Sequence, residues 1–316
     1  MKVLELNYNE YSNYNFESHI FNGLDFIEFN KDKCTRVIFL VFKDSKIRFG
    51  LPVGIKNNII KSPFSAPFGG ITYKKNNTKH ISFSIALKAL NNYARLNKYD
   101  SIEFFLPPSF YDKDNHAKFI TAALMSDFSV NFIEINHSFN LKNFGSDYLK
   151  LINYGARKAL NIAFAKELTF SICITDEQKI NAYNIIKKNR QERGFPLKLS
   201  QEDIFGTIEF IKSFFFIVSL PNGAGIASAI CYEVQKEIIQ IIYWGNLTKY
   251  SDNKPINFLS YKLFDFFKNL NYKVIDIGPS SEDGIVNYGL SDFKESIGCD
   301  KYLKFNLINK LKNNIE

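Results

Sequence analysis

Hydrophobic and polar positions change in blocks along the chain, and the second half shows the clearest pattern. An apolar stretch at 213–220 is followed by Pro-Asn-Gly-Ala-Gly, and further apolar stretches lie at 226–233 and 237–244. Short apolar runs separated by turn residues predict the three strands of an antiparallel meander. Helical spacing at 257–270, a strand at 274–277, a helix at 288–297 and a strand at 302–307 complete the order β-β-β-α-β-α-β.

The first half of the chain repeats this order. Apolar patterning predicts strands at 36–42, 47–53 and near 70–73, a helix at 81–96, a strand at 101–106, a helix at 116–125 and a strand at 130–135. We therefore predict an α+β fold with mixed α/β sheets, built from two tandem domains, residues 1–145 and 146–316. The alternative is coincidence, because many mixed chains alternate helices and strands in this way.

A helical insertion opens the predicted second domain. Residues 148–166 show helical spacing with a basic face, residues 168–173 read as a strand, and residues 176–193 read as a long helix. Thr175 is the expected N-cap of the long helix, since its hydroxyl can accept from the first free backbone N–H groups. Gly194 and Pro196 are expected to end that helix.

Composition fits a folded chain, with 316 residues, 46% hydrophobic and 23% charged. No apolar run approaches the roughly 20 residues that a membrane span needs. The N-terminus lacks a signal-peptide pattern, and the four cysteines are too scattered for a disulfide framework, so a cytoplasmic location is expected. The four histidines show no metal-binding spacing, and no metal is expected.

The net charge indicates which class of partner the chain could bind. It is 40 − 32 = +8, which suits an anionic partner such as a nucleic acid, a membrane surface or a phosphorylated small molecule. A Lys-rich solvated surface that binds nothing is the alternative, because no block of five or six like charges occurs.

One stretch of the sequence carries a family resemblance. Residues 287–298 read NYGLSDFKESIG, which has the form N-x-G-L-x-x-F-K-x-x-x-G. This resembles the ending of the FemABX-like branch of the GNAT acyl-CoA N-acyltransferase superfamily. The basic helix around Arg157, the long helix ending near Arg190 and the Asp-Ile-Gly at 276–278 are similar to that branch as well. The resemblance implies two tandem GNAT-like domains and the transfer of an acyl or aminoacyl group to an amine.

Three residues are candidates for catalysis under this resemblance. Asp276 is expected to accept a proton from the incoming amine, Tyr288 to protonate the leaving thiolate, and Lys294 to neutralise an oxyanion or a diphosphate. Each has a plainer alternative. Asp276 is then a cap for the following loop, Tyr288 a packed ring with its hydroxyl at the surface, and Lys294 a solvated helix residue.

Further residues are candidates for binding. We expect contacts to the substrates from Arg157, Arg190, Tyr243, Trp244, Asn287 and Phe68, and contacts to the acyl donor from Gly245, Asn246 and Asn257. The alternatives are core packing for the aromatic residues at 243 and 244, and a helix C-terminal cation at position 190. The loop at 62–70, which contains Phe68, lies near the acceptor cleft under the resemblance, or is a structural turn.

The sequence thus predicts a cytoplasmic N-acyltransferase. Its donor is an acyl thioester, either acyl-CoA or acyl carrier protein, and its acceptor is an amine, expected on a nucleotide-linked sugar or an envelope or polysaccharide precursor. The pyrophosphate-binding motif of ordinary GNAT enzymes is absent, which puts acetyl-CoA in question. No heptad run for a tRNA-binding coiled coil occurs, which favours a thioester over aminoacyl-tRNA. The alternatives are an aminoacyl-tRNA-dependent transferase and a non-catalytic binding or scaffold protein, while nucleic-acid binding rests on charge alone.

Overall fold

The computed structural model describes residues 1–16, 18–74 and 78–311. The chain folds as two compact units: unit 1 comprises Met1–Ile135, Asp283–Ile285 and the chain from Tyr302, and unit 2 comprises Asn136–Glu282 and Val286–Lys301. The division differs from the contiguous ranges 1–145 and 146–316 that the sequence predicts. It falls inside a strand, and the chain returns to unit 1 twice.

Unit 1 contains a mixed sheet with helices α3 and α4 packed on it. Its strands follow the order β1-β2-β3-β4-β6-β15-β7. Tightly packed Phe49, Phe83 and Phe104 lie in the core between the sheet and these helices. The elements of the first part of the chain are β1 (Lys2–Leu6), α1 (Tyr8–Ser12), α2 (Leu24–Phe29), β2 (Arg36–Lys43), β3 (Ile47–Lys56), β4 (Ile59–Ser62), β5 (Thr72–Tyr73), α3 (His80–Leu96), β6 (Ser101–Phe105), α4 (His116–Leu124) and β7 (Ser129–Asn140), with short 3-10 turns at Ile20–Asn22, Lys31–Lys33 and Ser109–Tyr111.

The third strand of the unit 1 meander is β4, which the sequence reading missed. Asn57 and Asn58 both adopt positive φ, the conformation of a tight two-residue hairpin turn, so β4 folds back on β3 at once. The segment predicted as the third strand is β5, which has two residues and pairs with the other end of β3. The β4 strand then runs parallel to β6.

The strands of unit 2 follow the order β7-β12-β11-β10-β9-β8. Helix α9 packs on one face of these strands and encloses the hydrophobic core, and helix α7 packs on β10 and β11. The elements of the rest of the chain are α5 (Tyr148–Leu151), α6 (Tyr154–Phe164), β8 (Thr169–Ile172), α7 (Asp176–Glu192), α8 (Gln201–Ile208), β9 (Ser213–Ser219), β10 (Gly225–Gln235), β11 (Ile238–Asn246), α9 (Pro255–Asn269), β12 (Val274–Pro279), β13 (Ser281–Glu282), β14 (Ile285–Val286), α10 (Tyr288–Ser296) and β15 (Asp300–Lys310), with 3-10 turns at Leu141–Asn143 and Thr248–Asn253.

The helical insertion differs in one respect from its prediction. The single helix expected over 148–166 is two helices, α5 and α6. Asn153 interrupts it, because its extended backbone cannot continue a helix and its side-chain oxygen accepts from Ala156 N at 2.8 Å to cap α6. The long helix α7 begins as predicted, with Thr175 and Gln178 forming a capping box.

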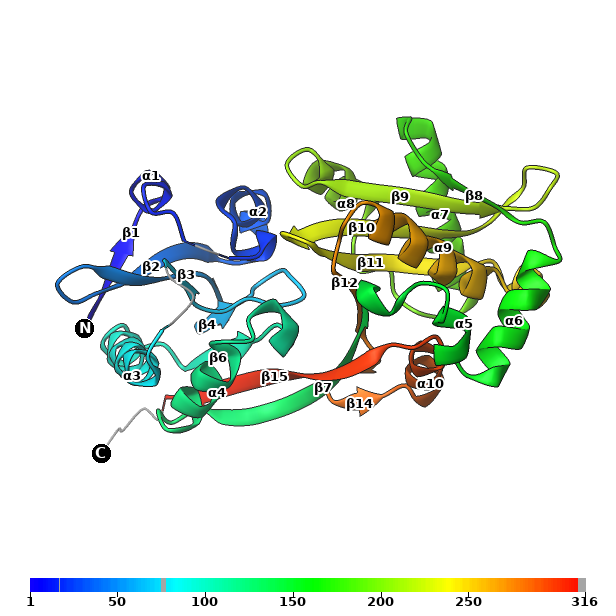
Figure 1. Cartoon of the computed structure of the whole chain (residues 1–316). Coiled ribbons are helices and arrows are strands. Elements are labelled where there is room, and N and C mark those ends of the chain that lie inside the picture. Colours follow the sequence, from blue (N-terminus) through cyan, green and yellow to red (C-terminus); the bar gives the residue numbers. More distant parts are fainter. Residues whose placement is uncertain (17, 75–77, 312–316) are drawn as a thin grey trace. The chain divides into compact units, whose positions relative to one another are not determined.

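The last strand of each repeat pairs in the other repeat's sheet. Strand β7 follows α4, yet its residues Asn136–Asn140 pair with β12 in unit 2. Strand β15 follows α10, yet Asn306–Lys310 pair with β6 in unit 1, so β15 lies between β6 and β7 there (Figure 1). This exchange explains why the units are not contiguous in sequence.

None of the helices in the described ranges combines the length and apolar character needed to cross a bilayer. Within the same ranges, histidine, cysteine, aspartate and glutamate side chains form no group of three placed to hold a metal ion.

Candidate functional site

The candidate site lies in unit 2, where the parallel strands β11 and β12 separate. The two strands pair over three positions only, and Gln240 opposite Asp276 is the last of them. Strand β11 continues to Asn246 and β12 to Pro279. A β-bulge at position 242 of β11 and a register shift after Asp276 in β12 accompany the separation. We call the Gln240–Asp276 position the vertex.

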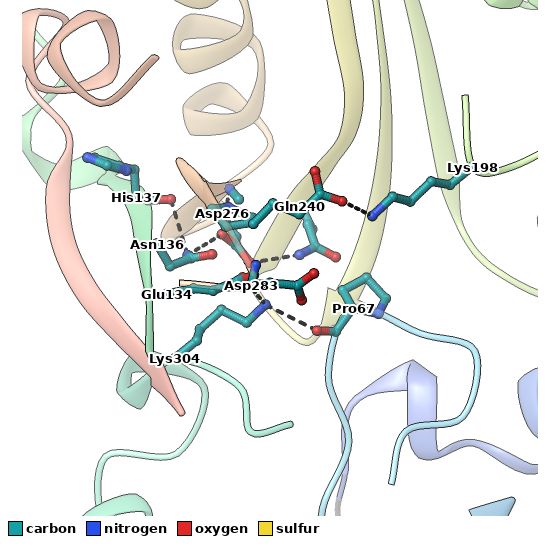
Figure 2. A network of polar contacts seen from close by, with 12 residues as sticks. Pro67, Glu134, Asn136, His137, Lys198, Gln240, Asp276, Asp283 and Lys304 are labelled. Carbon is teal, nitrogen blue, oxygen red and sulfur yellow. Dashed lines mark hydrogen bonds and ion pairs between the residues drawn. The ribbon is translucent and has the colours of Figure 1, made fainter. Parts of the chain in front are cut away.

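Asp276 organises the vertex. Its carboxylate accepts from Asn136 Nδ2 at 2.7 Å, from Gln240 Nε2 at 2.9 Å and from Gly278 N at 2.9 Å. Figure 2 shows the carboxylate between the two side-chain amides. Because these donors come from three segments of unit 2, the fully buried Asp276 ties β7, β11 and the bend of β12 together. Asp276 therefore does more than cap the following loop, which was the alternative role considered from the sequence.

Lys294 reaches the end of β12 from helix α10. Its ammonium donates to Gly278 O at 2.9 Å and to Pro279 O at 2.8 Å, and the side chain is buried. The sequence alternative of a solvated lysine is therefore wrong. A buried cation is retained only where strong acceptors compensate its desolvation, and here two backbone carbonyls do so. The positive charge thus lies beside the point where β11 and β12 separate.

A buried histidine links β12 to α10 next to Lys294. His137 Nδ1 lies 3.1 Å from Ser280 Oγ, and its Nε2 lies 3.4 Å from Ser291 Oγ. Ser291 donates to the carboxylate of Glu295, which can only accept, so Nε2 carries the proton and Ser280 donates to Nδ1. Burial lowers the pKa of His137 to about 4, and the Lys294 charge adds to this effect. His137 is therefore neutral near pH 7.

Arg190 and Tyr243 lie together on the α7 side of unit 2. The guanidinium of Arg190 lies over the Tyr243 ring, 5.3 Å from its centre. Burial lowers the pKa of Arg190, and its Nε is a buried atom without a hydrogen-bond partner among the described residues. The Tyr243 hydroxyl accepts from Leu199 N at 3.2 Å. The structure thus brings together two of the predicted substrate-binding residues.

The predicted donor-binding residues at the end of β11 make structural contacts. Asn246 donates to Leu247 O and to Ser251 Oγ, and its own carbonyl accepts from Asn189 Nδ2. Gly245 packs directly against Asn189. Trp244, which the sequence predicted to contact a substrate, is partly buried and forms an edge-to-face pair with Phe293 on α10.

The remaining predicted residues of unit 2 lie at helix surfaces. Asn287 caps α10, since its Oδ1 accepts from Leu290 N at 3.0 Å. Tyr288 follows it and is 77% exposed. Asn257 lies in the first turn of α9 and is partly buried. Arg157 lies on α6 with a buried Nε that has no partner among the residues described. The capping hydrogen bond of Asn287 explains its position at the start of α10.

Phe68 lies in unit 1, in the interior of its loop. Its ring is fully buried among aromatic side chains that include His19, Phe21 and Tyr111. Lys304 holds the same loop by donating to Pro67 O at 3.1 Å (Figure 2). Phe68 thus supports the loop from inside.

Sequence reasoning missed several polar residues of the site. They are Asn136, His137, Gln240, Ser280 and Ser291. Gln240 carried a signal, because it is the one polar residue in the apolar run Ile238–Ile242. A polar side chain inside a buried strand needs a partner, which pointed to a buried network. Asn136 and His137 carried none, because they follow the apolar residues that ended the predicted strand.

Comparison with known proteins shows which solved structures share this fold. No family model matches the sequence, and no curated protein is similar to it in sequence. Solved structures do match: FemX, with 12% identity, 97% of each chain covered and a TM-score of 0.65; L-PGS from Bacillus licheniformis, with 15% identity, 88% of this chain and 85% of that chain covered and a TM-score of 0.57; and a tandem GNAT protein from the clavulanic acid biosynthesis pathway, with 8% identity, 99% of each chain covered and a TM-score of 0.53.

These likenesses define a class of fold. The chain is a mixed α/β protein with a GNAT-like fold, as the sequence predicted. Its fold is similar to those of FemX, L-PGS and the tandem GNAT protein, as the resemblance in the sequence implied.

Proposed function

We propose that the chain is an N-acyltransferase, with its reaction centre at the vertex in unit 2. The observation that carries the proposal is the separation of β11 from β12 beyond Gln240 and Asp276, with the buried Lys294 ammonium held at the edge of the opening. Acyl transfer needs cations or N–H donors where negative charge develops on the carbonyl oxygen. A diverging strand and a fixed ammonium supply both kinds of group.

Each candidate residue has a proposed task. Lys294 stabilises the oxyanion that forms when the neutral amine attacks the acyl carbon, and the proton that the nitrogen then loses passes to solvent. Asp276 fixes the orientation of its neighbours, because three donors already engage its oxygens. Tyr288, exposed at the start of α10, remains the proposed acid for the leaving group. Arg190, whose Nε has no protein partner in the described ranges, is suited to an anionic part of the acceptor.

The donor we propose is an acyl thioester, and the acceptor is an amine on a nucleotide-linked sugar or an envelope or polysaccharide precursor. A second candidate is transfer from aminoacyl-tRNA. Two observations favour the second donor: the loop before α9 lacks the pyrophosphate motif, and the fold resembles that of FemX and L-PGS. The net charge of +8 suits either anionic donor.

Ligand-induced stabilisation separates the two donors. The purified protein is melted with coenzyme A, acetyl-CoA and a long-chain acyl-CoA, and separately with charged and uncharged tRNA. A ligand that binds only the folded state stabilises it by about 2.7 kcal/mol at a hundredfold excess over Kd. We expect a saturable rise with a thioester, followed by release of free thiol when an amine is added.

The variant Lys294→Met provides the control for catalysis. It should bind the donor but release no thiol. A rise with charged tRNA alone would replace the thioester by aminoacyl-tRNA. Failure of every donor to bind or to react would contradict the proposed transferase.

A further inference from the structure

Two buried polar groups at and beside the vertex have no hydrogen-bond partner among the residues that the structure describes. Tyr232 on β10 is 2% exposed and Gln240 on β11 is 4% exposed. The Tyr232 hydroxyl and Gln240 Oε1 both lack a hydrogen-bond partner within the described residues. Each would cost free energy if left unpaired, so a native fold retains them for a reason.

The two residues face one another. They are direct cross-strand partners in the antiparallel pair of β10 and β11, which places their side chains on the same side of the sheet. The residues next to them along the two strands belong to the core against α9: Ile239, Ile241 and Cys231. Tyr232 and Gln240 therefore point to the opposite side, which α7 covers.

The orientation of the Gln240 amide is fixed. Its nitrogen donates to Asp276 Oδ2 at 2.9 Å, and a carboxylate cannot donate in return. Rotating the amide would place two oxygens against each other, so Oε1 must point away from Asp276. An acceptor is thereby presented on the α7 side, with a negative charge directly behind it.

The chemistry of this pair defines its ligand. Gln240 Oε1 accepts only, and the nearby Asp276 carboxylate favours a positive charge. Burial raises the pKa of Tyr232, so its hydroxyl stays protonated and both donates and accepts. A group with several N–H donors and positive charge satisfies all three residues. An anion or a carbonyl group would meet the acceptor and the carboxylate unfavourably.

We propose that Tyr232 and Gln240 bind the primary amine of the acceptor, and that Asp276 positions Gln240 for this purpose. The inference rests on the proposed function and names the group that the site recognises. Because both side chains are buried, binding requires the elements that cover them to move. The loop at 193–200 is the proposed cover, because most of it is exposed and Leu199 bonds to Tyr243, which lies close enough to Tyr232 to interact with it electrostatically.

The first test compares two isosteric variants in thermal unfolding without ligand. Tyr148 is a matched control, since it is also buried in unit 2 but its hydroxyl donates to Ile297 O. Tyr232→Phe should leave the melting temperature unchanged or raise it, whereas Tyr148→Phe should lower it. A loss in Tyr232→Phe as large as that in Tyr148→Phe would overturn the proposal, because the hydroxyl would then be satisfied within the fold.

The second test uses ethanolamine and ethylene glycol as probes, which differ in one amine against one hydroxyl. At equal ionic strength, ethanolamine should raise the melting temperature saturably and ethylene glycol should not. Tyr232→Phe and Gln240→Met should abolish this difference, and Tyr148→Phe should keep it. Equal effects of the two probes, or an amine-specific rise that survives in Tyr232→Phe, would overturn the proposal.

These measurements need no donor, so they are independent of the proposed reaction. A protein that distinguishes the amine from the alcohol yet reacts with no donor would contradict the transferase function and keep the amine site. A protein that transfers acyl groups with unchanged rate in Tyr232→Phe would keep the function and overturn the site.

Discussion

Asn189 on α7 donates from its side-chain amide to the backbone carbonyl of Asn246 on β11, at 2.7 Å. The same side chain fills the space in front of Gly245, where an added Cβ would lie 2.4 Å from Asn189 Oδ1. The contact brings helix and strand together at the far end of β11, beyond the vertex. Gly245 is required there because Asn189 approaches its backbone closely. Its conformation does not require glycine, since its φ is not in the left-handed region.

We therefore expect Gly245→Ala to destabilise the protein by about 1–3 kcal/mol, the usual cost of overpacking. Urea denaturation measures it. The double variant Gly245→Ala with Asn189→Ala should lose less than the sum of the two single variants, because the second change removes the clashing atoms. If the losses of stability in the two single variants simply add in the double variant, the contact with Asn189 does not restrict the size of residue 245.

Gly278→Ala offers the matched comparison. Nothing lies within 4 Å of a Cβ at this position, but the backbone has φ +79°. The cost should come from backbone strain alone, roughly 1–2 kcal/mol, and no second-site change in a neighbouring side chain should relieve it. Rescue by such a change would contradict the strain explanation.

The role of Asp276 is tested by Asp276→Asn. The substitution keeps the size of the side chain but places an amide N–H₂ where donors approach from Asn136, Gln240 and Gly278. At least one buried donor is left unpaired, at about 1–3 kcal/mol. Unfolding in urea should show this loss, and Lys150→Met, at an exposed position, should change stability by less than about 0.5 kcal/mol. Equal stability of the two variants would refute the structural role.

His137 should be neutral and protonated at Nε2. Burial lowers its pKa from 6.5 to about 4, so the folded state binds this proton less readily than the unfolded state. Its contribution to stability is fully present above pH 6.5 and is lost as the pH falls toward 4. Nitrogen-15 NMR of the imidazole reads the tautomer and the titration directly, with His137→Gln to assign the signals. An Nδ1–H tautomer, or titration near pH 6.5, would contradict the hydrogen-bond chain described for Ser280 and Ser291.

Lys304 in unit 1 forms a buried ion pair with Glu134, at 3.7 Å. Lys304→Met removes one charge and leaves the other buried, which costs about 3–5 kcal/mol in comparable pairs. Replacing both residues, with Glu134→Leu as the second change, should restore part of the loss. Equilibrium unfolding of the two variants provides the comparison, and a double variant less stable than Lys304→Met would contradict it.

The sequence was informative wherever local chemistry decides the structure. The turn around Asn222–Gly223 and its flanking apolar runs predicted β9 and β10, and the structure confirms both. The capping role of Thr175 is confirmed for the same reason. These features depend on neighbours in sequence, so pattern and propensity suffice to find them.

The features that were missed depend on distant partners. Strand β7 extends to Asn140 through Asn136, His137 and Ser138, beyond residue 135, where the predicted strand ends. They are strand residues because β12, far away in sequence, pairs with them and their side chains are buried. The same applies to β15, whose partner β6 could not be inferred from either segment alone. Pairing of this kind overrides local polarity.

The position of β15 has a consequence for the order in which the chain can fold. During synthesis, β6 and β7 are complete long before residues 302–310 exist, yet β15 belongs between them. The edges of β6 and β7 that flank β15 in the folded protein therefore lack this partner while unit 2 is made. Such edges are prone to pairing with other chains. Unit 1 thus begins to emerge first but is completed last. The time for which its strand edges can pair with other chains depends on how quickly β15 is synthesised and paired.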